Sequence, residues 1–277
     1  MTLSDFSVLM SLYEKERPEF LSECLESLAS QTVIPNEIVI VFDGPLSTEL
    51  ERVVDSFAQK TNLIRKVRFA ENRGLGPALA DGLLACRYPL VARMDTDDIA
   101  RKDRFEVQLR TFLENEDLDI CGSHILEFDD DKNKVISKRA VPICHDDIVS
   151  FQRKRSAFNH MTVMYKKKAV IRAGNYEDCP LMEDDLLWSR MILSGARCAN
   201  IDDTLVYARA NGGMLSRRGG VSYWKKYKDA RKRIFRTGYI NGTEYISSIV
   251  VQFFVALAPT KVRRWIFRNV LRKRAGD

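Results

Sequence analysis

The chain has 277 residues, of which 45% are hydrophobic and 30% are charged. This composition is that of a globular protein with a sizeable core, and it excludes a disordered chain, a collagen-like repeat and a small disulfide scaffold. The formal net charge of +6 is unevenly distributed, because residues 217–277 hold 16 Lys and Arg against three Asp and Glu, whereas residues 1–216 hold 28 against 35. An acidic body therefore carries a basic tail, which suggests an anionic partner for the tail alone.

The distribution of cysteine and of apolar residues favours a cytoplasmic location. The six cysteines form no Cys-x-x-Cys pair and no zinc-finger arrangement with the three histidines, so we expect reduced thiols. The N-terminus reaches charged residues too early for a signal peptide. The longest apolar stretch, residues 246–258, is shorter than the roughly 20 residues of a spanning helix and contains Ser247, Ser248 and Gln252. We expect it to lie on a bilayer rather than to cross one.

Hydrophobic periodicity predicts strands that alternate with helices in the first half of the chain. Pro18 marks a helix start, and the Asp43-Gly44-Pro45 turn ends a strand rich in β-branched residues. Strands are predicted at residues 7–12, 38–42, 67–69, 90–94 and 119–121, and helices at residues 18–28, 48–58, 74–86 and 101–115. This alternation predicts an α/β fold with a doubly wound, mostly parallel sheet that binds ligands at the carboxyl ends of its strands.

The pattern loosens from about Glu127, where we expect a second ligand to bind. The sequence predicts a polar turn at 129–134, irregular structure at 141–147, a strand at 158–165, a helix at 183–193 that stops at Gly195, and basic helices after Gly219 with breaks at Gly238 and Gly242. We therefore predict a catalytic domain over residues 1–216 and a basic helical appendage over residues 217–277.

Two acidic clusters carry the clearest chemical signal. Asp95-Thr96-Asp97-Asp98 directly follows an apolar strand, where neighbouring carboxylates repel one another unless a hard divalent cation or ligand hydroxyls are present. The triplet Glu183-Asp184-Asp185 opens a predicted helix and offers a general base for a hydroxyl nucleophile. The structural alternative for both clusters is helix capping, because acidic residues favour helix N-termini.

Several further residues have a functional and a structural interpretation. Asp43, at a strand end, can accept hydrogen bonds from a nucleobase or ribose, or can form an Asx turn with Gly44. His160 can contact an acceptor or metal, or can serve a structural role. Arg209 and Arg217, on either side of Asn211-Gly212-Gly213, can close over a diphosphate, although Arg217 can simply begin the basic tail.

Taken in order, the motifs resemble those of the family 2 glycosyltransferases of GT-A fold, over about residues 6–216. The chain is most similar to the bacterial O-antigen and exopolysaccharide (amylovoran-type) transferases. The motifs that carry the resemblance are Val8-Leu9-Met10-Ser11-Leu12-Tyr13, Ser30-Gln31-Thr32, Ile38-Val39-Ile40-Val41-Phe42-Asp43-Gly44, Asn72-Arg73-Gly74, Asp95-Thr96-Asp97-Asp98, and Glu183-Asp184 with Trp188.

The resemblance implies a role for each matching residue. Tyr13 and Asp43 would bind the uracil end of a UDP-sugar with the help of Glu16, Asp95 would hold the ribose or sugar, and Asp97 would ligate Mn²⁺ or Mg²⁺ on the diphosphate. Asp184 would be the catalytic base. Arg73, Arg209 and Arg217 are expected to contribute to donor binding, and His160, Glu183 and Trp188 to acceptor binding.

The implied reaction is a metal-assisted single displacement that inverts the anomeric configuration. The donor would be a UDP-linked galactose or glucose, and the acceptor a polyprenyl-diphosphate-linked N-acetylhexosamine. The Gln-x-x-Arg-Trp motif of processive synthases is absent after Trp188, which disfavours polymerisation. The basic, partly apolar tail suits peripheral attachment to an anionic membrane surface at the inner face of the cell membrane.

Two other functions remain open at this point. A sugar nucleotidyltransferase would share an acidic metal site, but the chain has no Gly-rich Thr-Arg loop after the first strand for a triphosphate. A nucleic-acid-binding protein would use the basic tail, where Tyr223, Trp224 and Tyr227 lie among lysines. The acidic body argues against such a path, so we expect no nucleic-acid partner.

Overall fold

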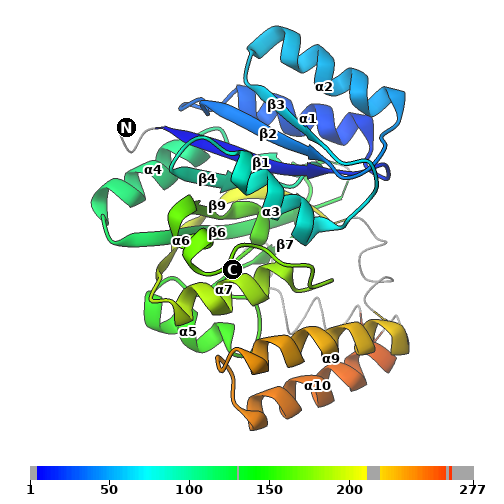
Figure 1. Ribbon diagram of the computed structural model, residues 1–277, viewed down its shortest axis with the longest axis vertical. Helices are drawn as coiled ribbons and strands as arrows, with labels where there is room; N and C mark the ends of the chain where they lie inside the picture. The colour runs from blue at the N-terminus through cyan, green and yellow to red at the C-terminus, as the bar shows by residue number, and fades with distance from the viewer. Residues whose placement is uncertain (1–4, 130, 211–218, 260–261, 264–277) are drawn as a thin grey trace.

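A single mixed β-sheet runs through the molecule and carries helices on both faces (Figure 1). The computed structural model describes residues 5–129, 131–210, 219–259 and 262–263. In this part of the chain the sheet has nine strands in the order β3-β2-β1-β4-β8-β6-β9-β5, with β7 paired to β6. The strands are β1 (Phe6–Leu12), β2 (Glu37–Phe42), β3 (Ile64–Arg68), β4 (Leu90–Arg93), β5 (Ile99–Ala100), β6 (Leu118–Phe128), β7 (Val135–Arg139), β8 (Met164–Lys166) and β9 (Arg197–Arg209).

The helices form a layer on each face of this sheet. Helices α1, α2 and α4 pack on one face, and α3, α5, α6 and α7 on the other. Their bounds are α1 (Pro18–Ala29), α2 (Thr48–Thr61), α3 (Leu75–Ala85), α4 (Arg104–Glu114), α5 (His145–Gln152), α6 (Lys167–Arg172) and α7 (Glu183–Leu193), and a short 3₁₀ turn, η1, spans His160–Thr162. This arrangement confirms the predicted α/β architecture.

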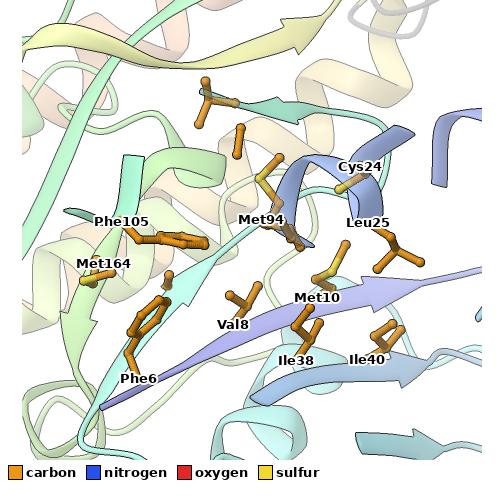
Figure 2. Close-up of a cluster of buried hydrophobic side chains, with 14 of the residues drawn as sticks. Phe6, Val8, Met10, Cys24, Leu25, Ile38, Ile40, Met94, Phe105 and Met164 are labelled. Carbon is orange, nitrogen blue, oxygen red and sulfur yellow. The ribbon is translucent and has the colours of Figure 1, made fainter. Parts of the chain in front are cut away.

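The central strands are apolar throughout because both of their faces are covered. Side chains alternate along β1, so that Val8 and Met10 enter the core under α1 and α4, whereas Leu9 enters the core under α3. Figure 2 shows the first of these cores, in which Met10 lies near Leu25 of α1 and Phe6 near Phe105 of α4. The two cores fix the sheet between its helix layers.

The register of the parallel strands decides where ligands can bind. Leu12 pairs with Phe42, and Phe42 pairs with Arg68, while β4 runs parallel to β1 on its other side. The loops after β1, β2 and β4 therefore leave the sheet at one edge. This edge carries Tyr13, Asp43 and Asp95, three of the residues singled out by their sequence context.

The second half of the chain differs most from the sequence-based expectations. The strand predicted at 158–165 is wrong, since η1 occupies part of it and only Met164–Lys166 pairs in the sheet. The irregular structure expected up to residue 147 is replaced from His145 by α5. The pattern also gave no indication of β7 or of the 13-residue β9, which pairs parallel to β6.

Two helices follow Gly219, as expected: α9 (Gly220–Arg236) and α10 (Gly242–Leu257). Gly238 has a left-handed φ of 81°, and Asn241 forms a capping box with Glu244, so the predicted breaks separate the helices. The pair packs on α7 through an apolar cluster that includes Leu186 and Ile234. In the described ranges no helix is both long and apolar enough to cross a membrane. The domain boundary predicted at residue 216 lies outside the described residues and stays a prediction.

Candidate active site

A pocket of about 520 Å³ opens at the carboxyl edge of the sheet. Its walls come from the loop after β1, the end of β2, the segment that leads into α3 and the acidic turn after β4. Five residues predicted to bind the donor or its metal line this pocket together: Tyr13, Glu16, Asp43, Asp95 and Asp97. Four segments that are far apart in the sequence thus meet at one concave surface.

Asp43 organises one wall of the pocket. Its two carboxylate oxygens accept hydrogen bonds from the backbone N–H groups of Arg73, at 2.7 Å, and Gly74, at 3.0 Å. Gly44 makes this approach possible, because its φ is +92° and a Cβ there would lie 2.7 Å from the nitrogen of Asn72. A carboxylate has about four acceptor sites, so Asp43 can hold this loop and still accept a hydrogen bond from a ligand.

The acidic turn after β4 concentrates carboxylates in a buried place. Burial, Asp95 and Glu16 raise the pKa of Asp97 to about 7, and burial with Asp97 and Asp95 raises the pKa of Asp98 well above its usual range. Glu16 accepts a hydrogen bond from the Thr96 hydroxyl at 2.5 Å. The protein therefore holds these acids close together against their mutual repulsion.

The donor set of this turn fits a hard divalent cation. Carboxylate oxygens are the ligands that Mg²⁺ and Mn²⁺ prefer, and the buried Oδ2 of Asp98 has no hydrogen-bond partner in the described part of the chain. The described residues contain no group of three or more His, Cys, Asp or Glu that could hold a metal ion by itself. Such cations commonly bind one or two carboxylates together with substrate phosphates, so the fit requires a phosphorylated ligand.

Helix α7 places a second set of carboxylates near this turn. Burial raises the pKa of Glu183 to about 7, with Asp185 and Asp95 adding to the rise, so Glu183 experiences the charge of the acidic turn. Burial, Asp185 and Glu183 also raise the pKa of Asp184 well above its usual range. Asp185 has a structural role, because its carboxylate accepts a hydrogen bond from Gln152 of α5 at 2.8 Å.

His160 and Trp188, which were predicted to bind an acceptor, lie in one aromatic cluster. Trp188 is only 1% exposed, and its ring lies 5.9 Å from the ring of His160 and 6.3 Å from that of Tyr176. His160 shares a hydrogen bond of 3.1 Å with the Tyr176 hydroxyl, and burial lowers the pKa of His160 well below its usual range. Trp188 is thus a packing residue that cannot offer its face to a sugar, which corrects the predicted contact.

The predicted arginines lie elsewhere. The Arg73 side chain pairs with Asp81 at 2.9 Å and lies over the Phe69 ring, and Arg73 is not among the residues that line the pocket. Arg209 ends β9 and is 7% exposed; its guanidinium donates to the carbonyl oxygens of Asp97 and Asp129 and to Glu23. Through these contacts Arg209 supports the acidic turn. It does not contact the donor as expected, which corrects the prediction. Arg217 lies outside the described residues.

The sequence reasoning missed Arg93, the last residue of β4. Arg93 is 1% exposed and forms an ion pair with Asp95, and its Nε has no hydrogen-bond partner among the described residues. Its positive charge counteracts the rise in pKa of both Asp97 and Glu183, so it acts on both acidic groups. The available signal was a charged residue inside an apolar strand, two positions before Asp95 and hence on the same face.

Known proteins are similar to this chain over most of its length. The sequence model described as glycosyl transferase family 2 matches residues 7–179. An uncharacterized glycosyltransferase of Haemophilus influenzae is 45% identical over 97% of this chain and 99% of that protein. The amylovoran biosynthesis glycosyltransferase AmsE of Erwinia amylovora is 38% identical over 95% of this chain and 98% of its own length. The UDP-Gal:alpha-D-GlcNAc-diphosphoundecaprenol beta-1,3-galactosyltransferase of Escherichia coli is 38% identical over 97% of both chains.

Solved structures share the fold at lower identity. Residues 1–349 of S. aureus TarS in complex with UDP-GlcNAc align with a TM-score of 0.66 at 18% identity, over 95% of this chain and 75% of that one. The chain spans 46% of the longer TarS chain. The mannosyltransferase PcManGT of Pyrobaculum calidifontis, in complex with GDP-Man and Mn²⁺, aligns with a TM-score of 0.62 at 15% identity, over 90% of this chain and 69% of that one.

The supporting role of Arg209 can be measured as stability. Arg209→Met removes the donors of two backbone carbonyl groups, and we expect the free energy of unfolding to fall by roughly 2–4 kcal/mol. Urea denaturation followed by circular dichroism provides the measurement. Arg197→Met, at the exposed start of the same strand, is the control and should change the free energy of unfolding by less than about 0.5 kcal/mol. Equal stability of the two variants would contradict the supporting role.

Proposed function

Because the chain belongs to glycosyl transferase family 2, we propose that it transfers galactose from UDP-galactose to a hydroxyl of a polyprenyl-diphosphate-linked N-acetylglucosamine. The observation that carries this proposal is the pocket in which Tyr13, Asp43, Asp95 and Asp97 converge. The choice of galactose over glucose, and of the lipid-linked acceptor, is supported by the printed activity of the E. coli relative. The product would contribute to an O-antigen or exopolysaccharide.

In the proposed complex the pocket orients the donor. The uracil lies against Tyr13, whose side chain is partly exposed at the pocket wall, and donates a hydrogen bond to the Asp43 carboxylate. Asp95, which its ion pair with Arg93 holds in place, accepts a hydrogen bond from a hydroxyl of the ribose or sugar. Asp97 would hold Mn²⁺ or Mg²⁺ on the diphosphate, where the cation would neutralise the charge of the leaving UDP.

Asp184 is the proposed catalytic base. Its raised pKa makes its carboxylate a stronger base than an ordinary aspartate, which suits the removal of a proton from an acceptor hydroxyl. The hydroxyl oxygen attacks the anomeric carbon as the bond to the UDP oxygen breaks, and Asp184 keeps the proton. One displacement inverts the configuration, so an α-linked UDP-sugar gives a β-glycoside, and transfer stops after one sugar.

The C-terminal helices are proposed to rest on the inner face of the cell membrane. Helix α10 exposes one apolar stripe to solvent, in which Phe254 is 67% and Val251 63% exposed. The other members of the stripe are Ile246, Val250 and Leu257. Neighbouring α9 exposes basic residues in its first half, Lys225 and Lys226. An apolar stripe beside basic residues is the composition of a helix that binds an anionic bilayer surface.

Asp184→Asn tests the assignment of the base. Loss of a general base typically costs about 10²–10⁴ in rate, whereas the donor contacts are unchanged. We therefore expect galactose transfer from UDP-galactose to a synthetic lipid-diphosphate N-acetylglucosamine to fall by this factor, with the Kd for UDP preserved by calorimetry. Asp147→Asn, an exposed acid of α5, is the control and should transfer at the wild-type rate. Full turnover of Asp184→Asn would rule out this role.

The pH dependence of transfer gives a second test. A base works only when deprotonated, so the rate falls as pH drops through the raised pKa of Asp184. Glu183→Gln removes a neighbouring negative charge and should lower that pKa, which moves the acid limb of the kcat profile to lower pH. Glu114→Gln, at the exposed end of α4, should leave the limb in place. An acid limb that does not move in Glu183→Gln would contradict the interaction.

Membrane attachment is tested by co-sedimentation with vesicles that contain phosphatidylglycerol. The double variant Val251→Ser/Phe254→Ser removes two side chains, and the burial of each is worth about 1.5–3 kcal/mol. We therefore expect its partition coefficient onto the vesicles to fall at least tenfold. Leu113→Ser, which changes a 59% exposed leucine of α4, is the control and should sediment like the wild type. Unchanged sedimentation of the double variant would refute the attachment.

A further inference from the structure

The segment that leads into α7 has an unusual backbone. Three residues in it adopt left-handed φ angles: Gly174 at 91°, Asn175 at 63° and Leu181 at 79°. A leucine rarely adopts this region, and Leu181 is also 46% exposed, so burial of its own side chain does not compensate for the strain. Such a conformation persists only where neighbouring groups hold it. Leu181 lies two residues before Glu183 and three before Asp184.

Two of the groups that hold this segment belong to the part of the chain that precedes the C-terminal helices. Arg190 of α7 donates to the Glu177 carboxylate and to the Asn175 carbonyl oxygen. On the other side, the segment lies directly against the start of α3, where a Cβ on Gly76 would come within 2.1 Å of the Glu177 carbonyl oxygen. Gly76 follows the loop that Asp43 holds, so the segment connects the donor pocket to the carboxylates of α7.

The third holding group comes from the C-terminal helices. Arg233 of α9 donates to the same Glu177 carboxylate and to the Asp178 carbonyl oxygen. Beside this contact, Met182 at the start of α7 packs in one apolar cluster with Ile234 and Tyr239. Figure 1 shows α9 and α10 as a hairpin alongside α5 and α7. Glu177 is therefore shared by an arginine of the helix that carries the base and an arginine of the hairpin.

We propose that Arg233 is a positioning residue for the transfer reaction: through Glu177 and Asp178 it fixes the backbone that sets the start of α7, and hence the placement of Asp184. The proposal rests on the proposed function of Asp184 and goes beyond it, because it makes the C-terminal hairpin part of the catalytic apparatus. In this proposal the hairpin of α9 and α10 rests on the membrane and holds the segment that leads into α7. It thereby connects the membrane surface, where the lipid-linked acceptor is received, to the base that activates this acceptor.

The test compares Arg233→Met with Lys232→Met in the full-length protein. Methionine keeps an apolar stem at position 233 and removes only the guanidinium, and Lys232 is an exposed neighbour with no ion pair to a described residue. Misplacement of a catalytic group by about 1 Å costs as much as 10²-fold, so we expect kcat of Arg233→Met to fall between 10- and 100-fold. The Kd for UDP should change less than twofold, Lys232→Met should match the wild type, and Arg233→Lys should recover part of kcat.

Hydrogen–deuterium exchange over residues 176–186 provides a readout that does not depend on activity. Arg233→Met should exchange faster there than the wild type and Lys232→Met. Unchanged exchange, or a kcat equal to that of Lys232→Met, would overturn the proposal. An equal loss of kcat and of UDP binding would also overturn it, since this would show a general loss of structure. If the wild-type protein transferred no sugar and Arg233→Met nevertheless exchanged faster, the proposed function would be refuted, whereas the contact through which Arg233 positions the start of α7 would stand.

Discussion

Electrostatic repulsion between carboxylates at the carboxyl edge of the sheet is the constraint around which this molecule is built. The turn after β4 and the start of α7 bring acids together in a place with little water, and the pKa values of Asp97, Glu183 and Asp184 rise as a result. The protein offsets part of this repulsion with the buried charge of Arg93 and with backbone N–H groups such as that of Arg209, which donates to Asp98. The remaining negative charge is suited to a cation and a diphosphate.

The surrounding fold keeps this arrangement from relaxing. A solvent-exposed acidic loop would spread its charges apart, but the turn follows a strand that is buried on both faces and rests on the guanidinium of Arg209. Helix α7 is restrained in the same way, because the segment that leads into it is held between α3 and α9. Preorganised charge of this kind needs no rearrangement when the reaction charge develops.

The sequence was most informative where local physics decides the structure. Pro18, the apolar strands before Asp43 and Asp95, and the Asp-Gly turn are local signals, and the structure has the expected strands, helices and turn at these places. The long strand β9 escaped prediction because its pairing partner β6 lies some 80 positions earlier, and its central residues Asp202 and Asp203 interrupt the apolar pattern. Similarly, η1 replaced part of a predicted strand because Asn159 and Thr162 form hydrogen bonds to β6 that no local pattern indicates.

The candidate site shows the same division. The placement of Asp43, Asp95 and Asp97 at one pocket could be predicted because carboxylates at strand ends are visible in the sequence. Trp188 and Arg209 were assigned to ligands, although tertiary packing covers both. An arginine near a glycine-rich stretch and an arginine that ends a buried strand look alike until the partners are known. Arg233 could not be identified from the sequence either, since among many basic residues only its contact with Glu177 distinguishes it.

The central claim is tested most directly by the thermal unfolding midpoint, Tm, of the wild-type protein with Mn²⁺ alone, with UDP alone and with both together. Ligands that bind the native state raise Tm by mass action. If the acidic turn accommodates a cation together with a diphosphate, Tm rises distinctly more with both ligands than the two separate shifts add up to, and Asp97→Ala loses this excess. A Tm that is indifferent to the combination would contradict the account, because the clustered carboxylates would then have no cation and no diphosphate to receive.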